Sequence, residues 1–220
     1  DLLPDESTIL RFRHRLEEHK LAPKILATVN ELLERKGLLL RAGTVVDASL
    51  IAAPSSTKNQ GGQRDPEMKQ SKKGQQWYFG MKAHIGVDAE SGLVHTVRGT
   101  SGAVNDVVEA NALLHGQESE AIGDAGYQGA DKRPDAKSGV RWHVAMRPGR
   151  RKLLDKTQPL GRLMDEFEKL KASIRAKVEH PFRVVKRQFG HVKVRYRGLA
   201  KNTAQLHTLF ALSNLWMVRG

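Results

Sequence analysis

Three acidic residues stand where a carboxylate could be held rigidly enough to bind a metal ion. Asp47 lies in VVDAS, Asp124 in AIGDAGYQG and Glu179 in RAKVEHPFRVVKRQFG. Each aspartate follows a short apolar run, and its small neighbours leave room for a bulky ligand. Taken alone, each aspartate could instead begin an ordinary Asx turn. A third acid, on a helix packed against the same sheet, favours a shared site.

Glu179 is the single acid in a strongly basic stretch, residues 175–190. It could be a surface salt-bridge partner, or a metal ligand placed where a polyanion binds. Apolar residues at steps of three and four predict a helix with one buried face, and Glu179 lies at the rim of that face. Arg175 and Lys186 share its side of the helix, because seven residues are close to two turns. The apolar stripe consists of Ile174, Val178, Phe182, Val185 and Phe189.

Pro181 complicates this helix. It removes a backbone donor and clashes with the carbonyl of Lys177, four residues earlier. The apolar stripe crosses the proline without losing phase, which predicts one kinked helix with the kink beside Glu179. A helix that ends at Val178 and restarts at Pro181 is the alternative.

Convergent carboxylates repel one another unless a cation lies between them. The chain has no Cys and no paired-His motif, so its hard oxygen ligands favour Mg²⁺ or Mn²⁺ over zinc. Two such ions about 4 Å apart can activate a water or hydroxyl nucleophile and stabilise the leaving oxygen in phosphodiester cleavage. The three acids therefore predict a two-ion site for phosphodiester chemistry.

The elements that would position these acids follow from the hydrophobic periodicity. Residues 54–76 have almost no apolar side chains and predict a loop or flexible arm. Three consecutive strands, followed by alternating helix and strand, predict an α/β fold with a mixed five-stranded sheet and helices on both faces. In order, we expect two helices over 6–36, strands over 44–53, 78–88 and 93–98, a helix over 103–115, strands over 121–124 and 140–149, and helices over 162–189 and 201–218.

The composition points to a polyanionic partner. Of the net charge of +13, residues 147–197 carry +11, from 16 Lys or Arg against five Asp or Glu. Because phosphate neutralisation dominates nucleic-acid binding, a folded basic face for DNA is the natural interpretation, and a generally cationic surface is the alternative. The low mean hydropathy of -0.50 and the lack of a long apolar run exclude a membrane span. The absence of Cys fits a cytoplasmic protein.

Four segments in this order closely resemble bacterial insertion-sequence transposases of the DDE class. They are VVDAS, DPEM followed by KKGQQWYFGMKAHIGVDAESG, IGDAGYQG and RAKVEHPFRVVKRQFG, and they fit the insertion-sequence-five branch of the IS-four-like superfamily. The resemblance runs from about residue 5 to the C-terminus. It implies an RNase H-like catalytic domain over residues 41–220, preceded by a helical N-terminal segment, residues 1–40. Because the chain begins DLLPDEST without Met, we expect this segment to be truncated.

The resemblance also implies that the three acids form the catalytic, metal-binding DDE triad, served by Mg²⁺ or Mn²⁺, as two ions. The superfamily carries a Tyr-xx-Arg-xxx-Glu-xxxxxx-Lys signature, which Arg175, Glu179 and Lys186 match. Ala172 stands at the tyrosine position, so no tyrosine role transfers to it. The matching Arg and Lys would contact DNA phosphates near the scissile bond.

Further DNA contacts are predicted on the same helix and at the arm. Arg183 and Arg187 extend the basic face of the helix. Lys72 and Lys73 suit phosphate contacts without sequence specificity. Trp77, at the edge of the arm, could stack on an unpaired base or pack in the core.

Some other polar residues are interpreted as structural. We expect Asp88 to be a hairpin-turn residue and Asp106 to be an acid in the first turn of a helix. His84 and His95 are expected to be packed or solvent-facing residues of the hairpin rather than ligands.

These interpretations predict a transposase that cleaves insertion-sequence ends and transfers the freed strand to target DNA. The alternatives are an RNase H-like nuclease without strand transfer and a catalytically inactive DNA-binding remnant. The expected partner is double-stranded DNA, both ends and target, bound by a homodimer in the synaptic complex. The expected location is the bacterial cytoplasm, on the nucleoid when bound to DNA, with no membrane association.

Overall fold

One mixed β-sheet and one long helix carry the candidate carboxylates in the computed structural model, which describes residues 3–41 and 43–219. The strands are β1 (Thr44–Ala52), β2 (Lys69–Lys73), β3 (Gln76–Asp88), β4 (Val94–Ser101), β5 (Glu120–Gly123) and β6 (Arg141–Val144). The helices are α1 (Glu6–Glu18), α2 (Leu21–Arg35), α3 (Asp106–Glu109), α4 (Pro148–Lys152), α5 (Pro159–Arg183) and α6 (Leu199–Met217). Short 3₁₀ turns are η1 (Asn111–Leu113), η2 (Ala125–Tyr127) and η3 (Ala130–Lys132), and η4 (Val184–Gln188) is a π-helical turn.

β1 is the central strand of the sheet. It pairs antiparallel with β3 and parallel with β5, and β6 adds to β5 in parallel. β4 pairs antiparallel with β3 on its other edge, and β2 pairs with the first residues of β3. This open mixed sheet flanked by helices is consistent with an RNase H-like DDE domain. It has six strands rather than the predicted five, because β2 is an additional strand.

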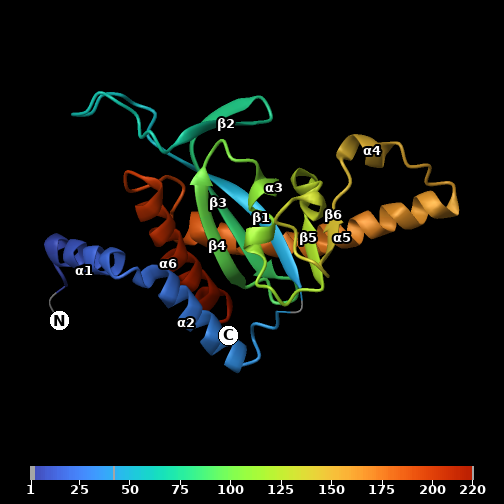
Figure 1. The fold of residues 1–220 in the computed structure, drawn as a ribbon, viewed down its shortest axis with the longest axis horizontal. Helices are drawn as coiled ribbons and strands as arrows, with labels where there is room; N and C mark the ends of the chain where they lie inside the picture. The colour runs from blue at the N-terminus through green and yellow to red at the C-terminus, as the bar shows by residue number, and fades with distance from the viewer. Residues whose placement is uncertain (1–2, 42, 220) are drawn as a thin grey trace.

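The two faces of the sheet are covered differently. Val45 packs with Val178 of α5 and Phe210 of α6, whereas Val46 packs with Tyr127 and Leu113 on the opposite face. Successive residues of a strand point to opposite faces, so Asp47, two residues after Val45, lies on the α5 face. Figure 1 shows α5 passing behind the sheet and α3 lying in front of it.

α5 is fastened to the last strands by buried charged groups. The Lys171 Nζ donates to the Val144 carbonyl at 3.0 Å, and the Met146 N–H donates to Glu168 Oε2 at 2.9 Å. The helix continues through Pro181, and the irregular turn follows it as η4. One continuous helix, rather than a break at Val178, therefore crosses the proline. In the part of the chain described above, no helix is long and apolar enough to cross a membrane.

The predicted N-terminal helices are present. α2 packs on α6, where the Asn214 amide donates to Asn30 Oδ1 at 2.8 Å. None of the described side chains of α1 is buried. In Figure 1, α1 and α2 lie on the α6 side of the molecule, away from β5 and β6. The division into an N-terminal segment and a catalytic domain stays a prediction.

The expectation of a loop over 54–76 is wrong for its second half. Residues 69–73 form β2, and Met68 is fully buried. β2 reads Lys-Gln-Ser-Lys-Lys, and none of its residues is buried, so it shows no hydrophobic alternation. It forms because its backbone pairs with the start of β3, which a pattern search on β2 alone does not detect.

The helix expected over 103–115 is also shorter than predicted. Only α3 and η1 form, separated by Ala110. Lys82 of β3 donates to the Val104 carbonyl at 2.7 Å and binds Asp106, which fixes the chain at the start of α3. Leu113 and Leu114 are buried beyond the end of α3, so their apolar character reflects packing rather than a longer helix.

Candidate active site

Asp47 and Asp124 lie side by side on neighbouring strands. β1 and β5 pair at Thr44–Ala121 and Val45–Ile122, and continuing that register brings Asp124 level with Asp47. Burial, assisted by the negative charge of Asp124, raises the pKa of the Asp47 carboxyl from 3.8 to about 6. The two carboxylates therefore interact, as expected for a pair that is to share a cation.

Asp124 uses one of its oxygens in a local turn. Its Oδ1 accepts a hydrogen bond from the Gly126 N–H at 2.8 Å, and η2 begins there. The Asx turn considered from the sequence is thus present, but it involves only Oδ1. Gly123 must be glycine here, because a Cβ at this position would lie 2.9 Å from the Cβ of Tyr127.

Glu179 lies on α5, and in the sequence it stands between two cations that lie near β1. Arg175, one turn earlier, is close enough to Asp47 for its positive charge to act on that carboxyl. Lys186, seven residues later, donates through Nζ to Ser49 Oγ at 2.6 Å, two residues beyond Asp47 on β1. Because η4 is a π-helical turn, the expected two-turn spacing does not hold at Lys186, and Arg175, four residues earlier on α5, is the cation that shares the side of Glu179. No hydrogen bond joins the Glu179 side chain to either aspartate in the described residues, and its place beside them stays a prediction.

The salt-bridge interpretation of Glu179 receives no support. The Glu179 side chain is exposed, and within residues 3–41 and 43–219 it forms no ion pair or hydrogen bond. An acid left unpaired among cations is a suitable ligand for a metal ion. The donors available from Asp47, Asp124 and Glu179 are all carboxylate oxygens, which fit Mg²⁺ or Mn²⁺.

Asp106 is a fourth acid at this place, and it was interpreted from the sequence only as a first-turn acid. It does lie in the first turn of α3, and its Oδ1 is 2.8 Å from Lys82 Nζ. Its Oδ2 would lie 3.9 Å from a Cβ built on Gly126, next to the turn of Asp124. Its charge also raises the pKa of Asp47. The sequence signal was Lys82 itself, since a lysine in an otherwise apolar strand needs an anionic partner.

A second group of potential metal ligands lies at the other end of β1. His95, His115 and Glu118 have ligand atoms within 4.8 Å of one another. Glu118 is already satisfied, because it accepts from the Thr44 hydroxyl at 2.9 Å and from the N–H groups of His115 and Gly116. Burial lowers the pKa of His95 to about 3, so its ring is neutral.

The ring of His115 opposes a metal at this group. The Gln117 N–H donates to His115 Nδ1 at 3.2 Å, which leaves the ring proton on Nε2, where a metal would have to bind. The group therefore serves as a hydrogen-bonded joint between β1, β4 and the segment before β5. His95 is packed, as expected.

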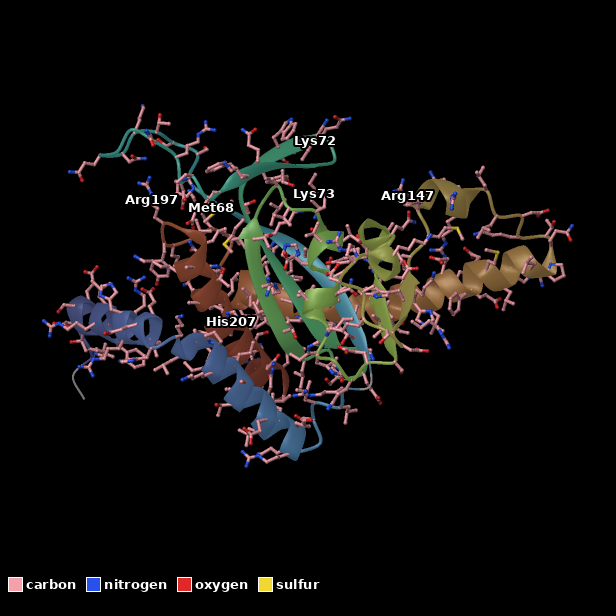
Figure 2. The ribbon with its side chains drawn as sticks, viewed as in Figure 1. Met68, Lys72, Lys73, Arg147, Arg197 and His207 are labelled. Carbon is pink, nitrogen blue, oxygen red and sulfur yellow. The ribbon has the colours of Figure 1, made fainter. Side chains whose placement is uncertain are left out.

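The predicted DNA-contact residues lie on α5, on the turn after it and on the β2–β3 hairpin. Arg183 and Arg187 are exposed on and just after α5. Burial, and next the positive charge of Lys73 on the β2–β3 hairpin, lower the pKa of Lys186. Trp77 is 63% exposed, and Lys72 Nζ lies 5.9 Å from its ring centroid. Figure 2 shows Lys72 and Lys73 on the hairpin that projects from the sheet.

Comparison with known protein families gives one match. The family model described as the transposase DDE domain matches residues 39–215, which run from before β1 into α6 and include Asp47, Asp124 and Glu179. No solved structure matches the chain. Transposition-related nuclease activity on DNA is what this family implies. The match spans well over half of the sequence, so the chain belongs to the family of DDE-domain transposases.

Proposed function

We propose that this protein cleaves the ends of an insertion sequence in a metal-dependent reaction and joins the freed strand to target DNA. The observation that carries the proposal is the Asp47–Asp124 pair, whose charges interact where β5 ends beside the middle of β1. Glu179 on α5 completes the proposed triad. The motifs around these acids support assignment to the insertion-sequence-five branch.

In this proposal the protein's own residues hold the metal ions and orient the DNA phosphates. Asp47 and Asp124 are fixed by the sheet, and Glu179 approaches from α5. When bound, Mg²⁺ or Mn²⁺ at two positions would supply an activated nucleophile and stabilise the leaving oxygen. Arg175 and Lys186 would hold the phosphates on either side of the scissile bond, because both lie next to Asp47 and both are cationic.

The chemical outcome is hydrolysis followed by transesterification. Water attacks the phosphorus at the end of the element, and the 3′ oxygen leaves as a hydroxyl. That hydroxyl then attacks a target phosphodiester, and a target 3′ oxygen leaves in turn. Both steps are in-line displacements at phosphorus, so one constellation of carboxylates serves both.

The β2–β3 hairpin is proposed to lie along the DNA. Lys72 and Lys73 would contact phosphates, together with Arg183 and Arg187 of the α5 region. Trp77 is proposed to stack on an unpaired base, since it is exposed on a cationic hairpin instead of packing in the core. Trp77→Ala should then lower binding to ends with an unpaired terminal base more than binding to blunt duplex. Equal losses on both would contradict the stacking role.

Two protomers are proposed to act together at a pair of ends. The first half of α5 extends beyond the sheet in Figure 1 and presents apolar side chains at steps of three and four. These exposed residues are Leu160, Leu163, Phe167 and Leu170. Such a stripe suits a second helix of the same kind. Light scattering on the complex with end DNA should give two chains per particle, and a single chain would contradict the dimer.

The proposed activity is tested by cleavage and strand transfer on end-containing DNA with Mg²⁺. The parent is compared with Asp47→Asn, Asp124→Asn and Glu179→Gln. Each variant keeps the size of the side chain but loses the charge, so we expect a loss of at least about 100-fold in rate. Glu166→Gln on α5 and Asp131→Asn in η3 are matched controls, which should retain the parental rate.

The outcomes distinguish the three hypotheses for the function of the protein. Cleavage with joining in the parent, lost in all three variants, supports a transposase. Cleavage without joining supports a nuclease. DNA binding without cleavage supports an inactive remnant. Equal activity in the parent and the triad variants would remove the three carboxylates from the mechanism.

A further inference from the structure

The ammonium group of Lys186 is held on β1 by two oxygen atoms. Its Nζ donates to the Ser49 hydroxyl oxygen at 2.6 Å and to the Leu50 carbonyl at 3.0 Å. A lysine ammonium has three N–H donors, so one donor remains for a ligand. Lys186 is half-buried, and within residues 3–41 and 43–219 it forms no ion pair. A half-buried cation with an unused donor and no carboxylate partner is prepared for an anion from outside the protein.

The backbone on both sides of this link is anchored. Lys186 directly follows the buried Val185 in the π-helical turn η4. Beyond η4 the chain returns to the end of β1, where the Ala52 N–H donates to the Val192 carbonyl at 3.3 Å and the Val194 N–H donates to the Ala52 carbonyl at 2.8 Å. π-helical turns next to α-helices are frequent at functional sites. The lysine is therefore carried by a segment whose position relative to β1 is fixed.

The Ser49 hydroxyl also keeps a donor. Its oxygen accepts from Lys186, and its own proton has no acceptor among the residues that the structure describes. Ser49 is half-buried and lies opposite Ala83 in the ladder of β1 and β3, so its own backbone is held by the sheet. Ser49 and Lys186 together offer one O–H and one N–H, which suit an anionic oxygen.

This pair lies on the same face of β1 as Asp47. Residues two apart on a strand point to one face, which places Ser49 about 7 Å from Asp47 along the strand. DNA phosphates are the anions that the proposed reaction brings to Asp47. A strand whose scissile phosphate lies at Asp47 therefore has a neighbouring phosphate within reach of Lys186.

We propose that Ser49 is a positioning residue, which holds the Lys186 ammonium at β1 so that its free N–H donates to the DNA phosphate next to the scissile one. This inference rests on the proposed function of Asp47 and Lys186. A free lysine side chain has high rotamer entropy, and fixing it before binding lowers the cost of association. Loss of the Ser49 hydroxyl should weaken DNA binding about 3–10-fold, since only the Leu50 carbonyl then holds the ammonium.

The test compares Ser49→Val with Ser49→Thr, which have the same shape and differ in the hydroxyl. Binding of end-containing duplex DNA is measured by fluorescence anisotropy with Ca²⁺, an oxygen-binding ion, in place of Mg²⁺, and the DNA is recovered to verify that it is uncut. Ser49→Val should bind about 3–10-fold more weakly than the parent, whereas Ser49→Thr should bind like the parent. Thr208→Val on α6 is the matched control, because it loses a hydroxyl that bonds only within its own helix.

A second measurement distinguishes positioning of the lysine from a structural role. Each phosphate near the cleavage site is replaced in turn by an uncharged methylphosphonate. In the parent, one position next to the scissile phosphate should weaken binding, and in Ser49→Val this penalty should shrink while the penalties elsewhere stay. Lys186→Met should abolish the same penalty, and adding Ser49→Val to Lys186→Met should change nothing further.

Several results would overturn the inference, and they differ from failure of the proposed function. Equal DNA affinity in the parent and Ser49→Val contradicts it, even if the parent cleaves DNA. A lower thermal midpoint in Ser49→Val with an unchanged methylphosphonate pattern would show that the link is only structural. If Ser49→Val does not fold, Ser49→Ala, which cannot crowd its neighbours, takes its place. Cleavage absent in a parent that shows the expected penalties would remove the proposed reaction and leave the role of Ser49.

Discussion

Asp47 is the residue where the demands of folding and of the proposed chemistry conflict most. It is partly buried on the α5 face of β1, beside Asp124 and near Asp106. Its ionised form is therefore disfavoured in the metal-free protein, although an ionised carboxylate is the form that binds a metal. The conflict is expected at functional sites, where stability is given up for a prepared geometry.

This conflict predicts a pH-dependent gain in stability for Asp47→Asn without metal. The pKa of Asp47 is raised from 3.8 to about 6, so folding stability is lost as the pH rises through about 6. At pH 7.5 in EDTA the variant should be about 1–2 kcal/mol more stable, less than the full linkage value because the side chain is partly exposed. The gain should vanish below pH 4, where the Asp47 carboxyl is protonated in both the folded and the unfolded protein.

Urea unfolding at a series of pH values checks this prediction. Asp131→Asn is the control, because Asp131 is exposed and should show no such pH dependence. A destabilised Asp47→Asn at pH 7.5 would mean that the carboxylate is satisfied in the fold and is not strained by its neighbours.

Single residues show what the sequence reveals about the site. Asp47, Asp124 and Glu179 could be selected because each carries a local signal, either small neighbours after an apolar run or an acid in a basic stretch. Asp106 carries no such local signal. Its partner Lys82 is distant along the chain, and the two meet only after the sheet forms.

At the scale of elements, the arm and the last helix support each other. α6 begins at Leu199 without a side-chain cap from its own neighbours. Acids of the arm instead accept hydrogen bonds from its first N–H groups. The Gly198 N–H donates to Asp65 Oδ2 at 2.6 Å, and the Leu199 N–H donates to Glu67 Oε2. Carboxylates are favourable at helix N-termini because of the free N–H groups and the helix dipole.

Glu67→Gln should therefore lower the free energy of unfolding by about 1 kcal/mol, since the amide keeps the contact but loses the charge. Trypsin should also cut faster after Lys58 or Arg64 in the released arm. Both effects are measured against Glu31→Gln, an exposed acid of α2 that should leave them unchanged. An unaltered unfolding midpoint and cutting rate would show that the arm is not anchored through Glu67.

Element types were largely predictable where one face is apolar, as in β1, α5 and α6. The predicted boundaries of α2, α5 and α6 fall within a few residues of those observed, because apolar residues recur at helical spacing. β2 has no such signal, and its pairing with β3 is tertiary. The prediction of one helix over residues 103–115 was wrong, because Leu113 and Leu114 are apolar for packing and lie beyond the short helix that forms.

At the scale of the whole molecule, cations of two elements, the α5 region and the β2–β3 hairpin, act near Asp47. The basic α5 region and the β2–β3 hairpin both border β1, so a bound DNA would pass between two cationic elements. Association should be strongly salt-dependent, because each phosphate contact releases condensed counterions.

Replacing Lys72 and Lys73 together by Ala should weaken DNA binding and reduce the slope of log affinity against log salt by about 1–2. The loss should be similar for different sequences, because these lysines contact phosphates. Fluorescence anisotropy over a salt series measures both quantities, with Lys24→Ala on α2 as the control remote from the hairpin. An unchanged slope would place the DNA elsewhere.

The most direct test of the central claim is to locate the bound ion by the damage it causes. Fe²⁺ replaces Mg²⁺, and added hydrogen peroxide is reduced at the ion to hydroxide and a hydroxyl radical, which cuts the nearby polypeptide backbone, while ascorbate regenerates Fe²⁺. We predict cuts near residues 47, 124 and 179 together, all lost in Asp47→Asn. Cuts that cluster instead around His95, His115 and Glu118, or that persist in Asp47→Asn, would contradict a metal site built from the three carboxylates.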